Sequence, residues 1–400
     1  MLGGVFFESR PGPSGGLYRR ALLCYRSVAG RADARSDAAP SKICSVVVAE
    51  DTDLDRKSRK SHSTAEVAAD GKPVELLLLS GREIEALVPP EHAVAAVEDA
   101  YRQLADNRDD QGRSLGFAVE HGSIHVKAGL LPGSHLCFAA KINVNLPDNR
   151  RRFGLPTIQG VVVLADAATG RPLALLESMA LTALRTAATA ALAARFGARR
   201  DSRRAAIVGC GAQARFQLAA IAACFPLEEV LVFDADAARA EAFARGQSGA
   251  AYRCAARAGI AAAVDGADIC VTCTTATAPV LTDALALAGC FVAAVGADNP
   301  DKQEIDPALM RRARLLVDDL EACASGGDLH HALKAGLVSR DDVHADLADL
   351  ASGRKRGRRS PGELVIFDST GSGVQDVAVA WAAFQRARER GGLPAFDLAG

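Results

Sequence analysis

The sequence predicts an α/β protein with a parallel sheet, and two observations support this fold class. From residue 205 the chain passes through AAIVGCG, AQARFQLAAIAACF and EEVLVFD, an apolar run, a helical segment and a second apolar run. This is the β-α-β alternation of a parallel sheet. Further along, GADICVTCTT, GCFVAAVGAD and ARLLVDD repeat the apolar pattern, and we expect them to extend the same sheet.

Length and composition limit the possible partners. A chain of 400 residues exceeds the usual size of one domain, so two domains are expected. The net charge of −1 gives no broad basic face for nucleic acid, and no run reaches the roughly 18 apolar residues that span a bilayer. The ten cysteines are scattered, and six lie in or beside apolar segments, which indicates reduced thiols in a cytoplasmic protein. Cys270 and Cys273 form the only close pair, which argues against a zinc site.

Residues 1–75 differ in composition from the rest of the chain. They are rich in Arg, Ser, Gly, Pro and Ala and show no sustained periodicity, so we predict a disordered or weakly structured tail. No apolar segment of a signal peptide precedes a cleavage site. After Met1 the next methionine is Met179. We therefore expect a natural start at a non-ATG codon near Val74.

The segment from residue 76 to 198 is predicted to form a first domain. LLLLS is a short strand in which Ser80 caps a helix, and REIEALV and HAVAAVEDAYRQLAD are amphipathic helical segments. SIHVKAG and HLCFAAKINVN alternate as strands, and TIQGVVVLADAATGRPLALLES reads as a hairpin. MALTALRTAATAALAARFG predicts a long helix with Gly197 at its C′ position. The last 70 residues do not continue the alternation, so we expect them to return to this domain.

The strongest motif in the chain is a dinucleotide-binding turn. Gly209-Cys210-Gly211-Ala212-Gln213-Ala214 fits G-x-G-x-x-A directly after a strand and before a helix. The first glycine permits the tight turn, the second allows a pyrophosphate to approach, and the helix N-terminus attracts the phosphates. EEVLVFD ends in Asp234, where an acid would accept hydrogen bonds from the adenosine ribose. Asp234 favours NAD over NADP, although Arg239 could still reach a 2′-phosphate.

Several charged residues are candidates for substrate binding and catalysis. Asp298 follows an apolar run that ends in glycine, so it is either a turn residue or an acid at the edge of the sheet where ligands bind. Lys141 ends the apolar run CFAAK and is either a lysine that snorkels at a sheet edge or a buried lysine with a partner. The other candidates are Arg113, Lys127, Glu177 and Arg185.

Five motifs resemble the ornithine cyclodeaminase and mu-crystallin family. They are, in order, KINVNLPDNRRRFGLPTIQG, ESMALTALRTAAT, VGCGAQA, VGADNPDKQEID and VIFDSTGSGVQD. The resemblance implies a Rossmann NAD(P)-binding domain, residues 199–329, inserted in an α+β substrate-binding and dimerisation domain, residues 76–198 plus 330–400. It also implies a homodimer with a small amino or imino acid as substrate.

The resemblance also implies roles for individual residues. Arg113, Lys141 and Arg185 would surround the substrate carboxylate, and Asp298 would be the acid-base carboxylate, with Lys141 beside it in catalysis. The positions that resemble cofactor contacts are Thr157, Gly209, Gly211, Ala212, Gln213, Asp234, Thr274, Lys302 and Ser369. A carboxylate near the reacting carbon can stabilise a cationic iminium and move its proton.

One departure from the family pattern bears on the substrate. Cyclodeaminases carry a Glu at the position where this chain has His125, and Lys127 adds positive charge nearby. We therefore expect an NAD(P)H-dependent reductase of cyclic imino acids that converts Δ1-pyrroline-2-carboxylate to L-proline. Ornithine cyclodeaminase is the main alternative, followed by alanine dehydrogenase and a non-catalytic nucleotide-binding protein.

Overall fold

The computed structural model describes residues 5–11, 17–23, 75–107, 112–133, 136–249 and 251–398. Residues 1–64 and 65–400 form two separate compact units. In the first, β1 (Val5–Pro11) pairs antiparallel with β2 (Leu17–Leu23). The predicted tail falls mainly outside the described residues, and so does the expected start near Val74.

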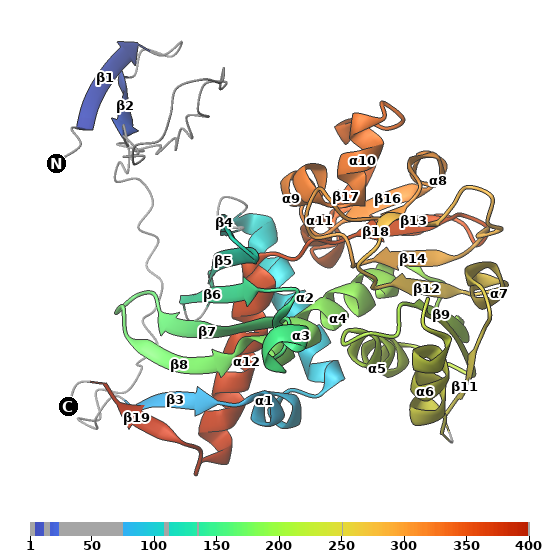
Figure 1. Ribbon diagram of the computed structural model, residues 1–400, viewed down its shortest axis with the longest axis horizontal. Helices are drawn as coiled ribbons and strands as arrows, with labels where there is room; N and C mark the ends of the chain where they lie inside the picture. The colour runs from blue at the N-terminus through green and yellow to red at the C-terminus, as the bar shows by residue number, and fades with distance from the viewer. Residues whose placement is uncertain are drawn as a thin grey trace, which may run out of the picture. The chain divides into compact units, whose positions relative to one another are not determined.

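A seven-stranded sheet carries the first half of the second unit (Figure 1). Its order is β19-β3-β8-β7-β6-β5-β4, and every neighbouring pair is antiparallel except β3 with β8. The hairpin expected from TIQGVVVLADAATGRPLALLES is the antiparallel pair β7–β8. The strands are β3 (Glu75–Leu79), β4 (Arg113–Val119), β5 (Gly122–Leu131), β6 (Cys137–Asn145), β7 (Ile158–Asp166), β8 (Pro172–Glu177) and β19 (Ala395–Asp397).

Three long helices cover one face of this sheet, here named the inner face. They are α2 (Pro90–Asp106), α4 (Ser178–Gly197) and α12 (Gly373–Arg390), and α12 contacts β5 and β6 directly. The short α1 (Gly81–Leu87) begins at Ser80, which forms a capping box with Glu83 as the sequence predicts. Because side chains alternate along a strand, the opposite or outer face receives every second residue.

An eight-stranded parallel sheet forms the other half, and it confirms the α/β class. Its order is β11-β10-β9-β12-β14-β18-β16-β17, and every pair is parallel. β12 and β14 are buried at every residue because helices lie on both faces. The strands are β9 (Arg204–Val208), β10 (Glu229–Phe233), β11 (Arg253–Ala256), β12 (Ile269–Thr272), β14 (Phe291–Ala294), β16 (Arg314–Val317), β17 (Val343–Asp346) and β18 (Val365–Asp368).

Shorter elements complete this half of the unit. β13 (Thr277–Leu281) and β15 (Gln303–Ile305) make a separate parallel pair. The helices are α3 (Asn149–Phe153), which belongs to the first half, and α5 (Ala214–Cys224), α6 (Ala237–Gln247), α7 (Ile260–Val264), α8 (Pro307–Arg311), α9 (Leu320–Gly326), α10 (Asp328–Lys334) and α11 (Leu347–Ala351).

The expected return of residues 330–400 to the first domain is only partly correct. β18 lies between β14 and β16 in the parallel sheet, and β17 is its edge strand. Hydrogen bonds to β14 and β16 hold the ELVIFD segment there. The expectation that the alternation stops was wrong, because β17 and α11 continue it up to β18. Only α12 and β19 return to the seven-stranded sheet.

The helix α4 lies between the two sheets (Figure 1). It contacts β7 on one side and β14 and β18 on the other, so it is buried on almost every side. Gly197 is its last helical residue rather than a left-handed C′ residue, and Ala198 is the C-cap. The glycine is needed because a Cβ at this position would lie 2.5 Å from the Phe291 ring. No helix among the described residues has the length and apolarity needed to span a membrane.

Candidate functional site

The glycine turn joins β9 to α5 at the carboxyl edge of the parallel sheet. Gly209 has φ +99°, and a Cβ there would lie 2.9 Å from Cγ2 of Thr274. Both features require glycine. A Cβ on Gly211 would meet nothing within 4 Å, so the backbone here leaves space for a phosphate to approach.

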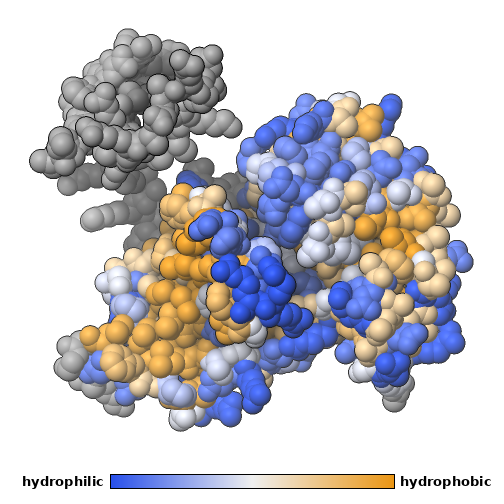
Figure 2. Space-filling model, in the orientation of Figure 1, coloured by the Kyte–Doolittle hydropathy of each residue, from blue (hydrophilic) through white to orange (hydrophobic). Residues whose placement is uncertain are grey.

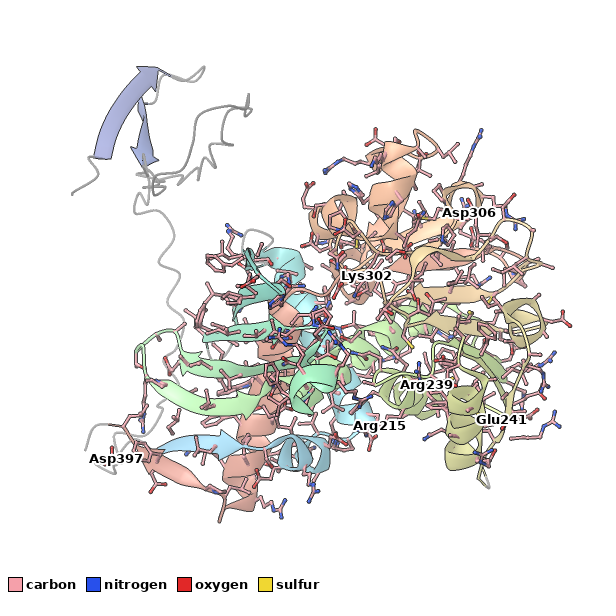
Figure 3. The ribbon with its side chains drawn as sticks, in the orientation of Figure 1. Arg215, Arg239, Glu241, Lys302, Asp306 and Asp397 are labelled. Atoms are coloured by element: carbon pink, nitrogen blue, oxygen red, sulfur yellow. The ribbon has the colours of Figure 1, made fainter. Side chains whose placement is uncertain are left out.

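Asp234, at the end of β10, braces this turn. Its carboxylate accepts hydrogen bonds from the backbone N–H of Cys210 at 2.8 Å and of Asp236 at 2.8 Å. Arg239 forms an ion pair with it at 3.2 Å and remains half exposed (Figure 3). Nearby, Oε1 of Gln213 is buried without a hydrogen-bond partner in the described chain. A free acceptor and an open glycine turn fit a dinucleotide at this edge.

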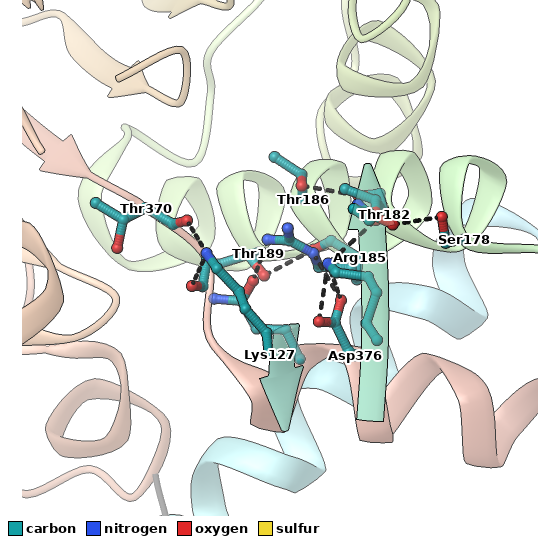
Figure 4. Close-up of polar contacts among 12 residues, drawn as sticks. Lys127, Ser178, Thr182, Arg185, Thr186, Thr189, Thr370 and Asp376 are labelled. Carbon is teal, nitrogen blue, oxygen red and sulfur yellow. Dashed lines mark hydrogen bonds and ion pairs between the residues drawn. The ribbon is translucent and has the colours of Figure 1, made fainter. Parts of the chain in front are cut away.

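Two cations and one carboxylate meet on the inner face of the other sheet (Figure 4). Nζ of Lys141 on β6 lies 2.9 Å from the Asp376 carboxylate on α12, and Nε of Arg185 on α4 lies 3.0 Å from it. All three side chains are at least 93% buried. Lys141 is therefore a buried lysine with a partner and does not snorkel at a sheet edge.

Lys127 adds a third cation to this group. It pairs across the strands with Lys141, so both side chains leave the sheet on the inner face. Its ammonium donates to the backbone carbonyls of Thr370 at 3.1 Å and Gly371 at 3.0 Å (Figure 4). Three cations thus surround one carboxylate, which leaves positive charge for a second anion. We call Lys127, Lys141, Arg185 and Asp376 the cationic cluster.

Burial and charge set the protonation of this cluster. Burial, reinforced by Arg185 and Lys127, lowers the pKa of Lys141 to about 7, against the opposing attraction of Asp376. Burial would raise the pKa of Asp376, but Lys141 and Arg185 outweigh it and the pKa is lowered. Asp376 is therefore ionised at neutral pH, whereas Lys141 can gain or lose its proton there.

A second layer of hydrogen bonds holds the cluster. Arg185 donates to Oε1 of Gln375 at 2.8 Å, and the amide of Gln375 donates to the Tyr101 hydroxyl at 2.8 Å and to Asp318 at 3.0 Å. Asp318 also accepts from Oγ of Ser369 and the N–H of Gly371, each at 2.8 Å. The buried carboxylate of Asp318, at the end of β16, thus holds both Gln375, which accepts from Arg185, and the segment 369–371.

Asp298 lies beyond the end of β14 and forms an ion pair with Lys302. Its carboxylate lies 2.8 Å from Nζ of Lys302, and its side chain is 53% exposed. Burial alone would raise its pKa, but the charge and hydrogen bond of Lys302, with smaller contributions from Lys127 and Asn299, lower it. The field of Lys127 connects Asp298 electrostatically to the cationic cluster.

Buried Glu304 ties together the loops beside the glycine turn. Its carboxylate accepts from Oγ1 of Thr272 at 2.8 Å, the N–H of Thr274 at 2.6 Å and the N–H of Gly296 at 2.7 Å. These loops lead to the predicted cofactor residue Thr274 and to Asp298. Gly209, Thr274 and Lys302 therefore share one edge, with Ser369 following β18 at the same edge.

No contact among the described residues joins Arg113 to the cationic cluster, and Thr157, predicted as a cofactor contact, lies just before β7. Arg113 is exposed at the start of β4 and donates to the carbonyl of Gly112 at 2.9 Å. Ser114 pairs with Lys127, so alternation directs Arg113 toward the outer face. Thr157 is exposed, and its carbonyl accepts from the N–H of Leu146. Glu177, another sequence candidate, caps the N-terminus of α4.

Sequence reasoning did not assign Asp376, Asp318 or Glu304. Asp376 is an acid in the first turn of α12, directly before the apolar run VAVAWAAF, a signal that could have indicated a buried partner for a cation. Asp318 follows a parallel strand, which is the same signal that singled out Asp298. Glu304 gave no such signal, because its partners are backbone groups of distant loops.

Comparisons with known proteins find similarity over most of the chain. The model of the ornithine cyclodeaminase/mu-crystallin family matches residues 75–391. An alanine dehydrogenase of Archaeoglobus fulgidus is 35% identical over 320 residues, covering 78% of this chain and 96% of that protein.

Two solved structures have the same fold over most of the chain. An archaeal alanine dehydrogenase dimer with bound NAD has a TM-score of 0.75 at 33% identity and covers 81% of this chain and 99% of its own. The Δ1-pyrroline-2-carboxylate reductase of Thermococcus litoralis, in complex with NADH and L-proline, has a TM-score of 0.75 at 31% identity. That likeness covers 81% of this chain and 100% of the reductase.

Proposed function

The chain belongs to the ornithine cyclodeaminase/mu-crystallin family, and from this premise we propose that it is an NAD(P)H-dependent reductase that converts Δ1-pyrroline-2-carboxylate to L-proline. Its relatives are NAD-dependent oxidoreductases that act on C–N bonds, and so is this chain. The observation that carries the finer proposal is the cationic cluster, with three cations around one carboxylate.

The charge balance of the cluster favours a substrate with one carboxylate and no second amine. Asp376 already forms ion pairs with Lys141 and Arg185, so it is not free to hold a distal ammonium. His125, on the inner face of β5, hydrogen-bonds to Ser123 at 2.7 Å and supplies no negative charge. A cyclic imino acid needs only the cations and one carboxylate near its nitrogen.

The residues of the chain suit both halves of the reduction. Arg185 and Lys141 would bind the substrate carboxylate by charge-assisted hydrogen bonds and so fix the C=N carbon in place. Asp298, ionised at neutral pH, would stabilise the positive charge of the protonated imine. The imine nitrogen would therefore stay protonated while the carbon is reduced. NAD(P)H, when bound at the glycine turn, supplies the hydride, and the amine product retains the nitrogen proton.

The surroundings of Asp234 support NAD as the preferred cofactor. Its carboxylate stands at the end of β10, 2.8 Å from the N–H of Cys210, where it can accept from ribose hydroxyls and would repel a 2′-phosphate. Arg239 beside it offsets part of that repulsion, so NADP(H) would bind more weakly rather than not at all. A homodimer is proposed from the outer face of the seven-stranded sheet, where apolar side chains are exposed (Figure 2).

Alanine dehydrogenase is the second candidate. The 35% identity to the Archaeoglobus fulgidus enzyme favours it, and its chemistry needs the same cationic cluster and the same carboxylate. The two substrates differ in the source of the imine. Pyruvate forms it with free ammonia, whereas in Δ1-pyrroline-2-carboxylate the imine is part of the ring.

A substrate panel tests the proposal. Purified protein is mixed with NADH or NADPH and with Δ1-pyrroline-2-carboxylate, a six-membered cyclic ketimine acid, or pyruvate plus ammonia, and cofactor oxidation is followed by absorbance. Ornithine with NAD is assayed for proline. We expect kcat/KM to be highest for the five-membered imino acid with NADH. A higher value for pyruvate plus ammonia would establish the second candidate, and proline formed from ornithine would overturn both.

A further inference from the structure

A basic cavity is lined by residues that take no part in the proposed reduction. It has a volume of about 580 Å³ and is formed by the end of α4 and the segment from residue 353 to 361. We call it the basic pocket. None of its lining residues is acidic. Its cationic lining residues are Arg195, Arg199, Arg200, Lys355, Arg356, Arg358 and Arg359.

The floor of the basic pocket is rigid. Gly357 is buried, and a Cβ there would lie 2.1 Å from the carbonyl oxygen of Phe196, so only glycine lets the segment pack this closely. The backbone N–H of Arg358 donates to the same oxygen at 3.0 Å. The Arg358 side chain donates to the carbonyls of Gly197 at 2.7 Å and Cys290 at 3.0 Å. The cavity is therefore a built feature of the fold.

Carboxylates outside the lining neutralise four of the seven cations. Arg195 pairs with Glu98, Arg199 with Asp268, Lys355 with Asp349 and Arg359 with Glu363.

Three guanidinium groups of the pocket remain without an acidic partner. Arg358 hydrogen-bonds to backbone carbonyls, and the exposed guanidinium groups of Arg200 and Arg356 make no hydrogen bond or ion pair to any described residue. Burial and, to a smaller extent, the nearby charge of Arg199 lower the pKa of Arg358.

The basic pocket is separate from the cofactor edge. Arg200 precedes β9 and Pro361 precedes β18, so the pocket lies at the amino edge of the parallel sheet. The glycine turn and Asp234 follow β9 and β10 at the carboxyl edge. An anion in the pocket would therefore not compete with the dinucleotide.

We propose that the basic pocket binds a small polyphosphate anion, either inorganic or attached to a nucleoside. Guanidinium groups recognise phosphate oxygens with paired hydrogen bonds, and several unneutralised groups within one cavity suit a chain of phosphates better than a single carboxylate. The volume falls within the roughly 300–1,000 Å³ of small-molecule sites, which suits a small molecule rather than a macromolecule. The proposal goes beyond the proposed reductase activity and does not depend on it.

Titration calorimetry of the full chain tests this proposal. The probes are inorganic tripolyphosphate and ATP, each added in saturating NADH so that the cofactor site is filled. The test variant is the double substitution Arg200→Gln with Arg356→Gln. The matched control is Arg82→Gln with Arg311→Gln, which removes the same charge from two exposed arginines elsewhere. All four side chains are exposed, so folding should be unaffected.

We expect one site per chain, at least about tenfold weaker binding in the test variant and unchanged binding in the control. Tighter binding of ATP than of tripolyphosphate would identify the nucleoside-attached source, and equal affinities would identify the phosphate chain alone as the ligand. The proposal is overturned if neither probe binds the unsubstituted chain, or if the two double variants weaken binding equally. Circular dichroism and NADH affinity check that each variant is folded.

Discussion

The protonation of Lys141 depends on two opposing influences. Burial lowers its pKa to about 7, while Asp376 and Oγ1 of Thr182, the latter 3.2 Å from Nζ, favour the protonated form. The protonated lysine, present below this pKa, binds a carboxylate, and the neutral amine above it does not. We therefore expect kcat/KM for the imino acid to fall about tenfold per pH unit above pH 7.

The shape of the pH profile distinguishes the titration of Lys141 from a titration of the substrate. In Lys141→Arg the guanidinium stays charged, so the limb near pH 7 should disappear even if the maximal rate is lower. In Thr182→Val one acceptor of the ammonium is lost, and the limb should move to lower pH. An unchanged limb in Lys141→Arg would assign it to another group. The measurement is kcat/KM from pH 5 to 9 at constant ionic strength.

Asp298 is proposed to act on the reaction rather than on cofactor binding. Asp298→Asn keeps the size of the side chain but removes the charge that would stabilise the protonated imine. We expect kcat to fall by about 10² or more, with the Kd for NADH changed less than about threefold. Stopped-flow reduction and fluorescence titration of NADH measure the two quantities. A fall in NADH affinity with kcat unchanged would make Asp298 a cofactor residue.

Among individual residues, the sequence predicted those whose position follows from local context. The Gly209 turn, Asp234 and the charged end of β14 each stand at a position that the preceding strand defines. Asp376 could not be paired with Lys141 in advance, because 235 residues separate them and only the packing of α12 on β6 joins them. The neighbours of Arg113 could not be predicted either, because they depend on strand register, which a single sequence does not fix.

At the scale of the element, α4 links the two halves of the second unit. It carries Arg185 at the cationic cluster, and its end packs on Phe291 of the parallel sheet. In Gly197→Ala the new methyl would overlap the Phe291 ring, so we expect a loss of about 1–3 kcal/mol in the free energy of unfolding.

Gly246 provides the control for this substitution. It lies in α6, and a Cβ there would meet nothing within 4 Å beyond its own helix. Gly246→Ala should therefore raise the free energy of unfolding by about 0.5–1 kcal/mol through backbone entropy. Urea unfolding followed by circular dichroism measures both. If both substitutions changed the free energy of unfolding by the same amount, the contact with Phe291 would not be the reason for glycine at position 197.

The elements themselves were largely predictable, and their assembly was not. Apolar runs and a glycine turn defined β9, α5 and β10, and Ser80 marked the start of α1. The position of β18 between β14 and β16 depends on hydrogen bonds between segments about 50 to 70 residues apart. No local pattern in ELVIFD distinguishes a strand of one sheet from a strand of the other.

At the scale of the whole molecule, the outer face of the seven-stranded sheet carries an apolar patch (Figure 2). Leu115, Val126, Ile142 and Val161 pair directly across four neighbouring strands. Leu115 is 55% exposed and Ile142 is 42% exposed. An apolar ladder of this kind is costly on a monomer and typical of an interface.

The ladder gives a direct test of the proposed homodimer. Ile142→Glu would place a charge in the middle of the contact, where it would be buried without a partner in a dimer, while Lys141 beside it faces the opposite side of the sheet. We expect the unsubstituted chain to have the mass of a dimer in light scattering after gel filtration, and Ile142→Glu to shift it toward the monomer. Arg82→Glu, an exposed change on α1, should leave the mass unchanged. A dimer that persists in Ile142→Glu would mean that another surface mediates association, because two aligned carboxylates in an apolar contact cost more than such an interface gains.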